Sequence, residues 1–281
     1  MDVLLGAPVW YGNRPFDSTL KELYKLELDY FEFSLDYPLP DCMHDAERRD
    51  MKRLLEDCGL KIAFHSPLDI AVAHPREELA DASMAVLKRC MDFSAEFLPV
   101  SLYYNFHLHP RLSTFKLEEV RQMIIEEGLG RCRTITEMAS ESGIVVSVEN
   151  DLVSFEWSDL ILEALSLPNL YFTFDVGHAI MAELLSKDVQ KRVSYLDYIE
   201  RWIENCGAKI LVVHLHDCCL TDKQDHLSFG RGDLDFDAVF TLLKRTSCKY
   251  LLIETFWRNR NKDEMDYEEL GRNVEFCRSY L

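Results

Sequence analysis

Two short segments in the middle of the chain, IVVSVEN (144–150) and LYFTFDV (170–176), carry the pattern that decides the fold. Side chains alternate between two faces in a β-strand. In both segments one face is apolar, and the other carries a hydroxyl residue and then an acid, Glu149 or Asp175. A polar face suits a strand that lines a barrel and opens onto an active site, because strands of an open sheet covered on both sides are more often apolar on both.

Strands of this kind alternate with amphipathic stretches along the whole chain, which is typical of successive parallel β–α units. The predicted strands are VLLGAPV (3–9), YFEFSL (30–35), KIAFHS (61–66), VSLYYNFH (100–107), IVVSVEN (144–150), LYFTFDV (170–176), ILVVHLHD (210–217) and YLLIETF (250–256). Helices are predicted at 17–26, 45–59, 76–97, 189–207 and near 264–280. Several begin with Asp and two end with Gly, as helix caps do.

Eight strands with helices between them predict an α/β protein with a (β/α)₈ TIM barrel, although a doubly wound open sheet shares the alternation. The length of 281 residues allows either one such barrel or two smaller domains. No linker or low-complexity segment divides the chain, so one domain over residues 1–281 is expected.

Composition narrows the classes of partner and compartment. A formal net charge of −18 disfavours nucleic acid or an anionic membrane as general partners, because both attract basic surfaces; a local basic patch stays compatible with it. Nine cysteines show neither disulfide-framework spacing nor a CxxC pattern, which predicts a reducing cytoplasm. The N-terminus resembles a first strand and not a signal peptide, and no apolar run has the length of a membrane span.

Side chains able to bind metal stand at or near the carboxyl ends of most predicted strands. They are Glu32, His65, His107, Glu149, Asp175, His214 and Glu254. One such residue alone is more often a capping or solvated group. In a barrel, however, these ends converge on one mouth, where so many acids and histidines would repel or desolvate one another. A bound cation neutralises the acids directly, so the set predicts a metal site.

Two local patterns add detail to this site. His214 and His216 are two apart and share a strand face, with His214 deeper and the better ligand. For His216 the sequence leaves two predictions open: it contacts a metal ligand or the substrate, or it is a hydrogen-bonded residue of the barrel wall. Asp175 and His178 span a strand-to-helix turn and can both face the mouth, although Asp175 could instead only cap the helix.

The segment DHLSFGRGDLDF (225–236) follows the seventh strand and predicts a tight loop over the site. His226 lies where a barrel places its active-site loops. Arg231, between two glycines, would hold a phosphate or carboxylate of a substrate, or else be a solvated charge.

Together the motifs resemble the xylose-isomerase-like barrel superfamily, which includes sugar isomerases and epimerases and also endonuclease IV. The matching motifs, in order, are HSP (65–67), NFH (105–107), VEN (148–150), FDVGHA (174–179), HLHD (214–217), HLSFGRG (226–232) and IET (253–255). The resemblance spans residues from about 5 to 256. It implies a barrel fold, but such folds host several chemistries.

The resemblance also implies roles for individual residues. In the isomerases and epimerases one divalent cation is held by a quartet similar to Glu149, Asp175, His214 and Glu254, and the two glutamates exchange a proton with the substrate carbon beside the carbonyl. In endonuclease IV, further zinc ligands resemble His65, His107, His178 and His226. The Asp that normally stands two residues before the last of these is replaced by Gln224, with Asp222 and Asp225 as the candidate substitutes.

Three classes of function follow from the sequence. The first is a metal-dependent isomerase or epimerase of a small sugar or sugar-like hydroxy-carbonyl compound, with Glu149 and Glu254 as acid and base and with His178, His216, Arg231 and Glu32 as candidate substrate contacts. The second is a phosphodiester hydrolase of the endonuclease IV type, acting on abasic DNA or a small phosphorylated metabolite. The third is a non-catalytic binding barrel. One to three ions per chain are expected, from manganese, magnesium, cobalt or zinc.

Overall fold

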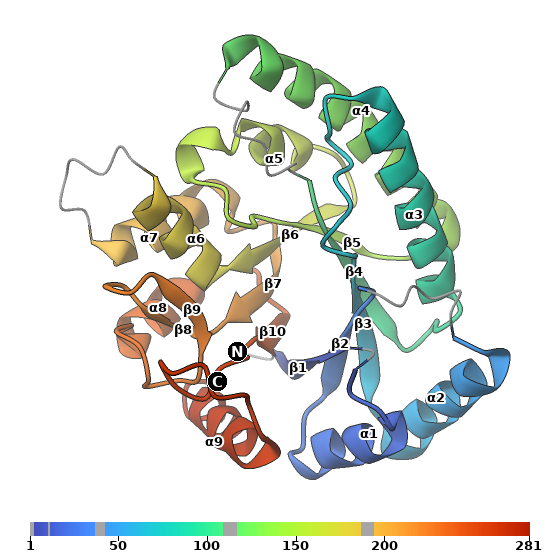
Figure 1. The fold of residues 1–281 in the computed structure, drawn as a ribbon, viewed down its shortest axis with the longest axis vertical. Helices are drawn as coiled ribbons and strands as arrows, with labels where there is room; N and C mark the ends of the chain where they lie inside the picture. The colour runs from blue at the N-terminus through green and yellow to red at the C-terminus, as the bar shows by residue number, and fades with distance from the viewer. Residues whose placement is uncertain (1–2, 11, 37–42, 109–116, 187–193) are drawn as a thin grey trace.

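The computed structural model describes residues 3–10, 12–36, 43–108, 117–186 and 194–281. Eight parallel strands close into a barrel in the order β1-β10-β7-β6-β5-β4-β3-β2, with helices around the outside (Figure 1). The strands are β1 (Leu4–Trp10), β2 (Tyr30–Ser34), β3 (Lys61–His65), β4 (Ser101–His107), β5 (Val146–Glu149), β6 (Leu170–Asp175), β7 (Ile210–Leu215) and β10 (Tyr250–Ile253). The predicted TIM barrel is confirmed, and each predicted strand is present with ends that differ by a few residues.

The helices are α1 (Phe16–Lys25), α2 (Asp45–Cys58), α3 (Glu77–Ala95), α4 (Glu118–Ser142), α5 (Asp159–Ala164), α6 (Val176–Leu185), α7 (Tyr195–Cys206), α8 (Phe236–Leu243) and α9 (Tyr267–Arg278). The predicted helix at 45–59 ends as expected, because Gly59 adopts the left-handed conformation (φ 68°) that closes a helix C-terminus. The helix predicted at 189–207 begins at Tyr195 with Ser194 as its cap, and residues 189–193 lie outside the described ranges.

The closed ring of strands explains the alternation seen in the sequence. Outward-facing side chains such as Phe172 and Phe174 pack against the buried Trp202 of α7, with ring centroids 5.4 and 6.4 Å away. Inward-facing side chains form a second apolar cluster inside the barrel, which includes Ala63 and Val212. Each of these two stands two residues before a histidine of the predicted site, on the same face of its strand. The apolar cluster therefore underlies the polar end of the barrel.

A short antiparallel hairpin, β8 (Asp217–Cys219) with β9 (Gln224–Leu227), follows β7 and was not predicted. Residues 225–236 were predicted to form one tight loop, but 225–227 belong to strand β9 of this hairpin. Asp217 accepts hydrogen bonds from the backbone N–H groups of Cys218 (2.8 Å) and Gly232 (2.7 Å). The hairpin and the turn that follows it are thereby fastened to the end of β7.

Other expectations concern the surface and the cysteines. In the portion of the chain that the structure describes, no helix is both long and apolar enough to cross a bilayer. The eight described cysteines are all free, in agreement with the absence of a disulfide pattern.

Hydrogen bonding between Tyr267 of α9 and Thr19 of α1 (3.1 Å) joins the last helix to the first, which completes the outer ring.

Candidate active site

The four residues of the predicted metal quartet come together at the carboxyl end of the barrel. Glu149 ends β5, Asp175 ends β6, His214 lies near the end of β7, and Glu254 follows β10. One candidate ligand atom from each of Glu149, Asp175 and His214 lies within 4.8 Å of the others. His214 Nδ1 is 3.1 Å from Glu254 Oε2 and 3.5 Å from Glu149 Oε2. The neighbouring positions of β5, β6, β7 and β10 in the barrel produce this convergence.

Glu149 is the most heavily contacted of these carboxylates. Its Oε2 lies 3.3 Å from His65 Nε2 and 3.4 Å from His107 Nε2, and it accepts a hydrogen bond from Asn105 Nδ2 at 2.5 Å. Its other oxygen, Oε1, lies 3.5 Å from His178 Nδ1. Asn105 was not singled out in the sequence, although it shares the inner face of β4 with His107. Glu149 therefore belongs both to the quartet and to a histidine group on β3 and β4.

His65 is oriented for ligation by the backbone carbonyl of the next residue. Its Nδ1 lies 2.8 Å from the carbonyl oxygen of Ser66, which can only accept a proton. When the ring is neutral, its proton therefore sits on Nδ1, and the lone pair of Nε2 is left facing Glu149 and a bound cation. This arrangement is common among histidines that bind metal.

Glu32 lies deeper in the barrel than the quartet. Its side chain is 2 % exposed, and its Oε2 is 3.4 Å from His214 Nε2, the ring nitrogen opposite the one that faces the two glutamates. A carboxylate at that nitrogen favours a proton there and leaves Nδ1 of His214 free for a cation.

Asp175 both caps α6 and faces the cluster, two roles that were predicted as alternatives. Its Oδ1 accepts the backbone proton of His178 at 2.6 Å and so caps α6. Its Oδ2 lies 3.4 Å from His178 Nδ1 and faces the cluster. The carboxylate therefore both starts the helix and contributes to the site.

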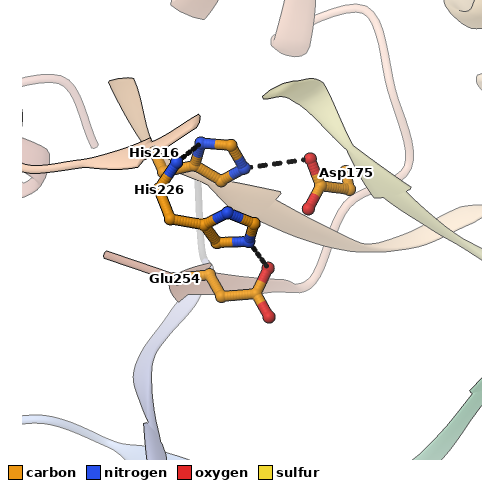
Figure 2. Close-up of side chains that lie close together, drawn as sticks. All are labelled: Asp175, His216, His226 and Glu254. Carbon is orange, nitrogen blue, oxygen red and sulfur yellow. Dashed lines mark hydrogen bonds and ion pairs between the residues drawn. The ribbon is translucent and has the colours of Figure 1, made fainter. Parts of the chain in front are cut away.

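The β8–β9 hairpin carries His226 over the mouth, close to Glu254 and His216 (Figure 2). His226 Nε2 lies 3.6 Å from Glu254 Oε2, and His226 Nδ1 lies 3.1 Å from Asp225 Oδ1. The ring of His226 stacks on that of Phe256, with centroids 4.6 Å apart. His178, Asp225 and His226 form a further group of potential ligands.

Electrostatics within the cluster favour opposite charges on the histidines and carboxylates. Burial by itself lowers the pKa of a histidine, but the carboxylates outweigh it and raise the pKa of His65 to about 10, of His178 to about 9 and of His226 to about 10. Burial likewise opposes ionisation of Glu149 and Glu254. The charges of His107 and His214 on Glu149, and of His214 on Glu254, nevertheless hold both pKa values well below the ordinary range.

The donor set fits a divalent cation. Several buried ligand-type atoms have no hydrogen-bonding partner among the described residues, although each lies at ion-pair distance from another acid or imidazole of the site: His107 Nε2, Asp175 Oδ2, His178 Nδ1, His214 Nδ1 and Glu254 Oε2. Leaving one such atom unpaired in a protein interior costs about 1–3 kcal/mol. Nitrogen and oxygen donors without sulfur suit zinc, manganese, cobalt or magnesium. The structure thus contains candidate metal-binding clusters.

The remaining predicted site residues lie at different distances from this centre. His216 is fully buried beside Asp175 and His226, and with these two residues and Glu254 it forms another group of potential ligands. Arg231 is about half exposed, and its nearest ion-pair partner is Glu269 of α9, at 3.6 Å. Asp225 was considered only as a substitute for the missing acid at 224, and the structure brings it to the histidines.

The fold is a (β/α)₈ barrel in which acids and histidines gather at the carboxyl ends of the strands. A family model described as "Xylose isomerase-like TIM barrel" matches residues 20–280, and the chain belongs to this family. The comparison with curated proteins found no match.

Solved structures resemble the chain over nearly its full length. A D-tagatose 3-epimerase-like protein is 18% identical with a TM-score of 0.73, covering 99% of this chain and 97% of that one. A 3-keto-D-glucoside 4-epimerase from E. coli is 15% identical with a TM-score of 0.68, covering 99% of each chain. D-psicose 3-epimerase from Clostridium cellulolyticum is 12% identical with a TM-score of 0.72, covering 99% and 98%. At these identities the similarity establishes the fold.

Proposed function

We propose that this protein is a divalent-metal-dependent isomerase or epimerase of a small sugar or sugar-like hydroxy-carbonyl compound. The observation that supports this most is the convergence of Glu149, Asp175, His214 and Glu254, with both glutamates beside the same imidazole. The similar folds of several sugar epimerases are consistent with it. A barrel that only binds a ligand has no need of two ionised glutamates at one centre.

The four quartet side chains would hold the ion, which when bound acts as a Lewis acid on the substrate oxygens. Glu149 and Glu254 carry out the proton transfer. One carboxylate removes the proton from the carbon beside the carbonyl, and the other, after taking up a proton from solvent, delivers it to the deprotonated substrate. Both glutamates are ionised at neutral pH because their pKa values are lowered, so either can serve as the base.

The rim of the cluster would contact the substrate. His178, His226 and Glu254 keep side-chain exposures of 12 %, whereas Asp175 and His214 have none. A substrate that enters from the mouth therefore meets these three side chains first. Arg231, on the turn after β9, would reach an anionic substituent only by leaving Glu269, so we expect uncharged sugars to be preferred over sugar phosphates.

Exchange of hydrogen between substrate and solvent tests the proposed reaction. In deuterated water with manganese, magnesium, cobalt or zinc supplied in turn, we expect the protein to place deuterium on the carbon beside the carbonyl of at least one ketose, aldose or hydroxypyruvate-like acid. Mass spectrometry and proton NMR measure the exchange, with chelator-treated protein as the control. If no compound exchanges with any metal while a phosphodiester is cleaved, the isomerase proposal is wrong.

A hydrolase of the endonuclease IV type is the second candidate, and two further ligand groups favour it. His65, His107 and Glu149 form one, and His178, Asp225 and His226 form the other. Glu149 is shared between the first group and the quartet, so it can bridge two ions, which in two-metal hydrolases lie about 3.5–4 Å apart. Asp225 supplies the carboxylate that Gln224 lacks. The strongly negative chain favours a small phosphorylated metabolite over DNA as substrate.

Metal stoichiometry separates the two candidates. One ion per chain supports the isomerase, and two or three support the hydrolase. If His65 and His107 complete a second site, a His65→Ala, His107→Ala double variant should hold one ion fewer than the wild type by elemental analysis after purification without chelator. A His44→Ala, His74→Ala double variant removes the same number of histidines outside the cluster and should keep the wild-type count. An unchanged count in the first variant would exclude a histidine site there.

A further inference from the structure

His216 makes two hydrogen bonds that together fix its proton. Its Nδ1 accepts the backbone N–H of His226 at 2.8 Å. An amide N–H can only donate, so Nδ1 carries the lone pair and the ring proton sits on Nε2. The carbonyl oxygen of Asp217 also lies 3.4 Å from Nδ1, but the shorter contact decides the tautomer. Nε2–H points at Asp175 Oδ1, 3.2 Å away (Figure 2).

The first consequence concerns the orientation of Asp175. Its Oδ1 accepts two hydrogen bonds, one from His216 Nε2–H and one from the backbone N–H of His178. With Oδ1 engaged in this way, the carboxylate cannot rotate freely, and Oδ2 remains directed at the cluster, without a hydrogen-bonding partner among the described residues. His216 therefore helps to set which oxygen of Asp175 faces a cation.

The second consequence concerns the hairpin. His226 has a φ of 54°, a conformation that residues other than glycine seldom adopt and that persists only when its surroundings hold it. Its N–H is held by His216, and its carbonyl oxygen accepts the N–H of Phe256 at 2.9 Å. The His226 ring lies between the rings of His216 and Phe256, with centroids 4.1 and 4.6 Å away and interplanar angles of 15° and 8°.

The start of α6 is shaped to admit the His216 ring. A Cβ built on Gly177 would lie 1.9 Å from Cε1 of His216, so any other residue at 177 would displace the imidazole. The ring is also fully buried. His216 thus occupies a closed slot between α6 and the hairpin, in contact with both Asp175 and His226.

We propose that His216 is a positioning residue that binds no metal itself. As a neutral Nε2–H imidazole it orients Asp175 and anchors His226 at the same time, so that the hairpin over the mouth and the ligand on β6 are held in register. The importance of this role rests on the proposed metal-dependent function. In this role His216 is neither a metal ligand nor a substrate contact.

Two substitutions separate the two bonds, because each retains one polar atom near its place in the imidazole. His216→Gln keeps an N–H donor at the Nε2 position for Asp175 and loses the acceptor for His226. His216→Asn keeps an acceptor at the Nδ1 position for His226 and cannot reach Asp175. The zinc affinity of each protein is measured by competition with a chromogenic chelator. Hydrogen exchange of residues 224–227 is measured by mass spectrometry.

We expect His216→Asn to weaken zinc binding by about 10–100-fold, as changes to groups that orient metal ligands do. His216→Gln should bind zinc close to the wild type but exchange the amides of 224–227 faster than His216→Asn. Equal losses of both properties in the two variants would reduce His216 to a packing residue and overturn the proposal. Wild-type protein that binds no zinc or other divalent ion would overturn the proposed function and the Asp175 part of the proposal.

The tautomer of His216 can also be measured by ¹⁵N NMR, independently of the metal affinity. In zinc-loaded protein labelled with ¹⁵N-histidine, the His216 signals, assigned by their loss in the Asn variant, should show the neutral Nε2–H pattern. The same pattern is expected in metal-free protein, because both hydrogen-bonding partners belong to the chain. A metal-bound ring nitrogen or the Nδ1–H tautomer would overturn the proposal, whatever reaction the enzyme catalyses.

Discussion

Glutamine in place of Glu149 or Glu254 is expected to lower the rate of isomerisation or epimerisation by about 10²–10⁴-fold, the usual contribution of general acid–base catalysis. Glutamine retains an oxygen that can still bind a cation but has no carboxylate to accept the substrate proton. Part of the metal should therefore remain while solvent hydrogen exchange at the substrate carbon collapses. Elemental analysis and deuterium incorporation are measured on the same preparation.

The matched control is Glu183→Gln on α6. Glu183 accepts the N–H of Phe155 at 2.8 Å, a bond that glutamine can keep through its oxygen, and it belongs to none of the ligand groups. Its variant should keep wild-type exchange and metal content. If either glutamate variant in the site retains near wild-type exchange, that residue is a ligand without a role in proton transfer.

Much of this site could be anticipated from the sequence because barrel topology converts linear position into spatial position. Residues such as Glu149 and Asp175 that end neighbouring parallel strands must meet at one rim, however far apart they are in the chain. Alternation predicts which face of each strand points inward. The order of residues along the strand then places His214, within β7, deeper than His216, which follows it. The strand order and the ring of helices follow from the same pattern.

The β8–β9 hairpin was less predictable, because loops follow local turn conformation and not a period. The family pattern places an acid at position 224, and Gln224 suggested that a ligand was missing. The positive φ of His226 and the turn at Lys223 (φ 52°) bring Asp225 to the histidines instead. Such conformations are uncommon for residues other than glycine and are not indicated by the sequence.

The paired tasks of Asp175 and His216 depend on individual atoms, which sequence patterns do not resolve. Capping and ligation appeared as alternatives for Asp175, yet its two oxygens divide them. His216 faces the interior as alternation predicts, but its partner at Nδ1 is a backbone amide ten residues later. Only the folded hairpin brings that amide to the ring.

Removing the metal is expected to have the second large effect, a change in how stability depends on pH, because the acids and histidines at the mouth must then balance one another's charge. Without a cation, the nearby carboxylates outweigh burial and raise the pKa of His214, the imidazole of the quartet, well above its ordinary value. They also raise the pKa of His65 and His226 to about 10 and of His178 to about 9, so these imidazoles are protonated at neutral pH. Ligation requires neutral imidazole, and metal uptake must therefore release protons. We expect metal affinity to keep increasing with pH up to about 9–10, beyond the point near 6.5 at which an ordinary histidine is already neutral.

The same pKa shifts predict opposite pH dependences of stability for the metal-free and the metal-bound protein. A group whose pKa is raised on folding contributes stability that is complete below its unfolded pKa, near 6.5, and is lost as the pH rises through the folded value. In excess chelator the free energy of unfolding should therefore fall between pH 6.5 and about 10, because the imidazolium charges that balance Glu149 and Glu254 disappear. Those two carboxylates stay ionised throughout this range, since their pKa values are lowered.

With metal present, the trend should reverse. Proton competition decreases as the pH rises, and bound metal at about 1,000 times its dissociation constant adds about 4 kcal/mol to the free energy of unfolding. Thermal unfolding from pH 6.5 to 10, with and without chelator, measures both profiles, and activity should vanish in the chelator samples. Parallel profiles in the two conditions would mean that these histidines are not displaced from their carboxylate partners by a cation, and the metal centre would have to be sought among other residues.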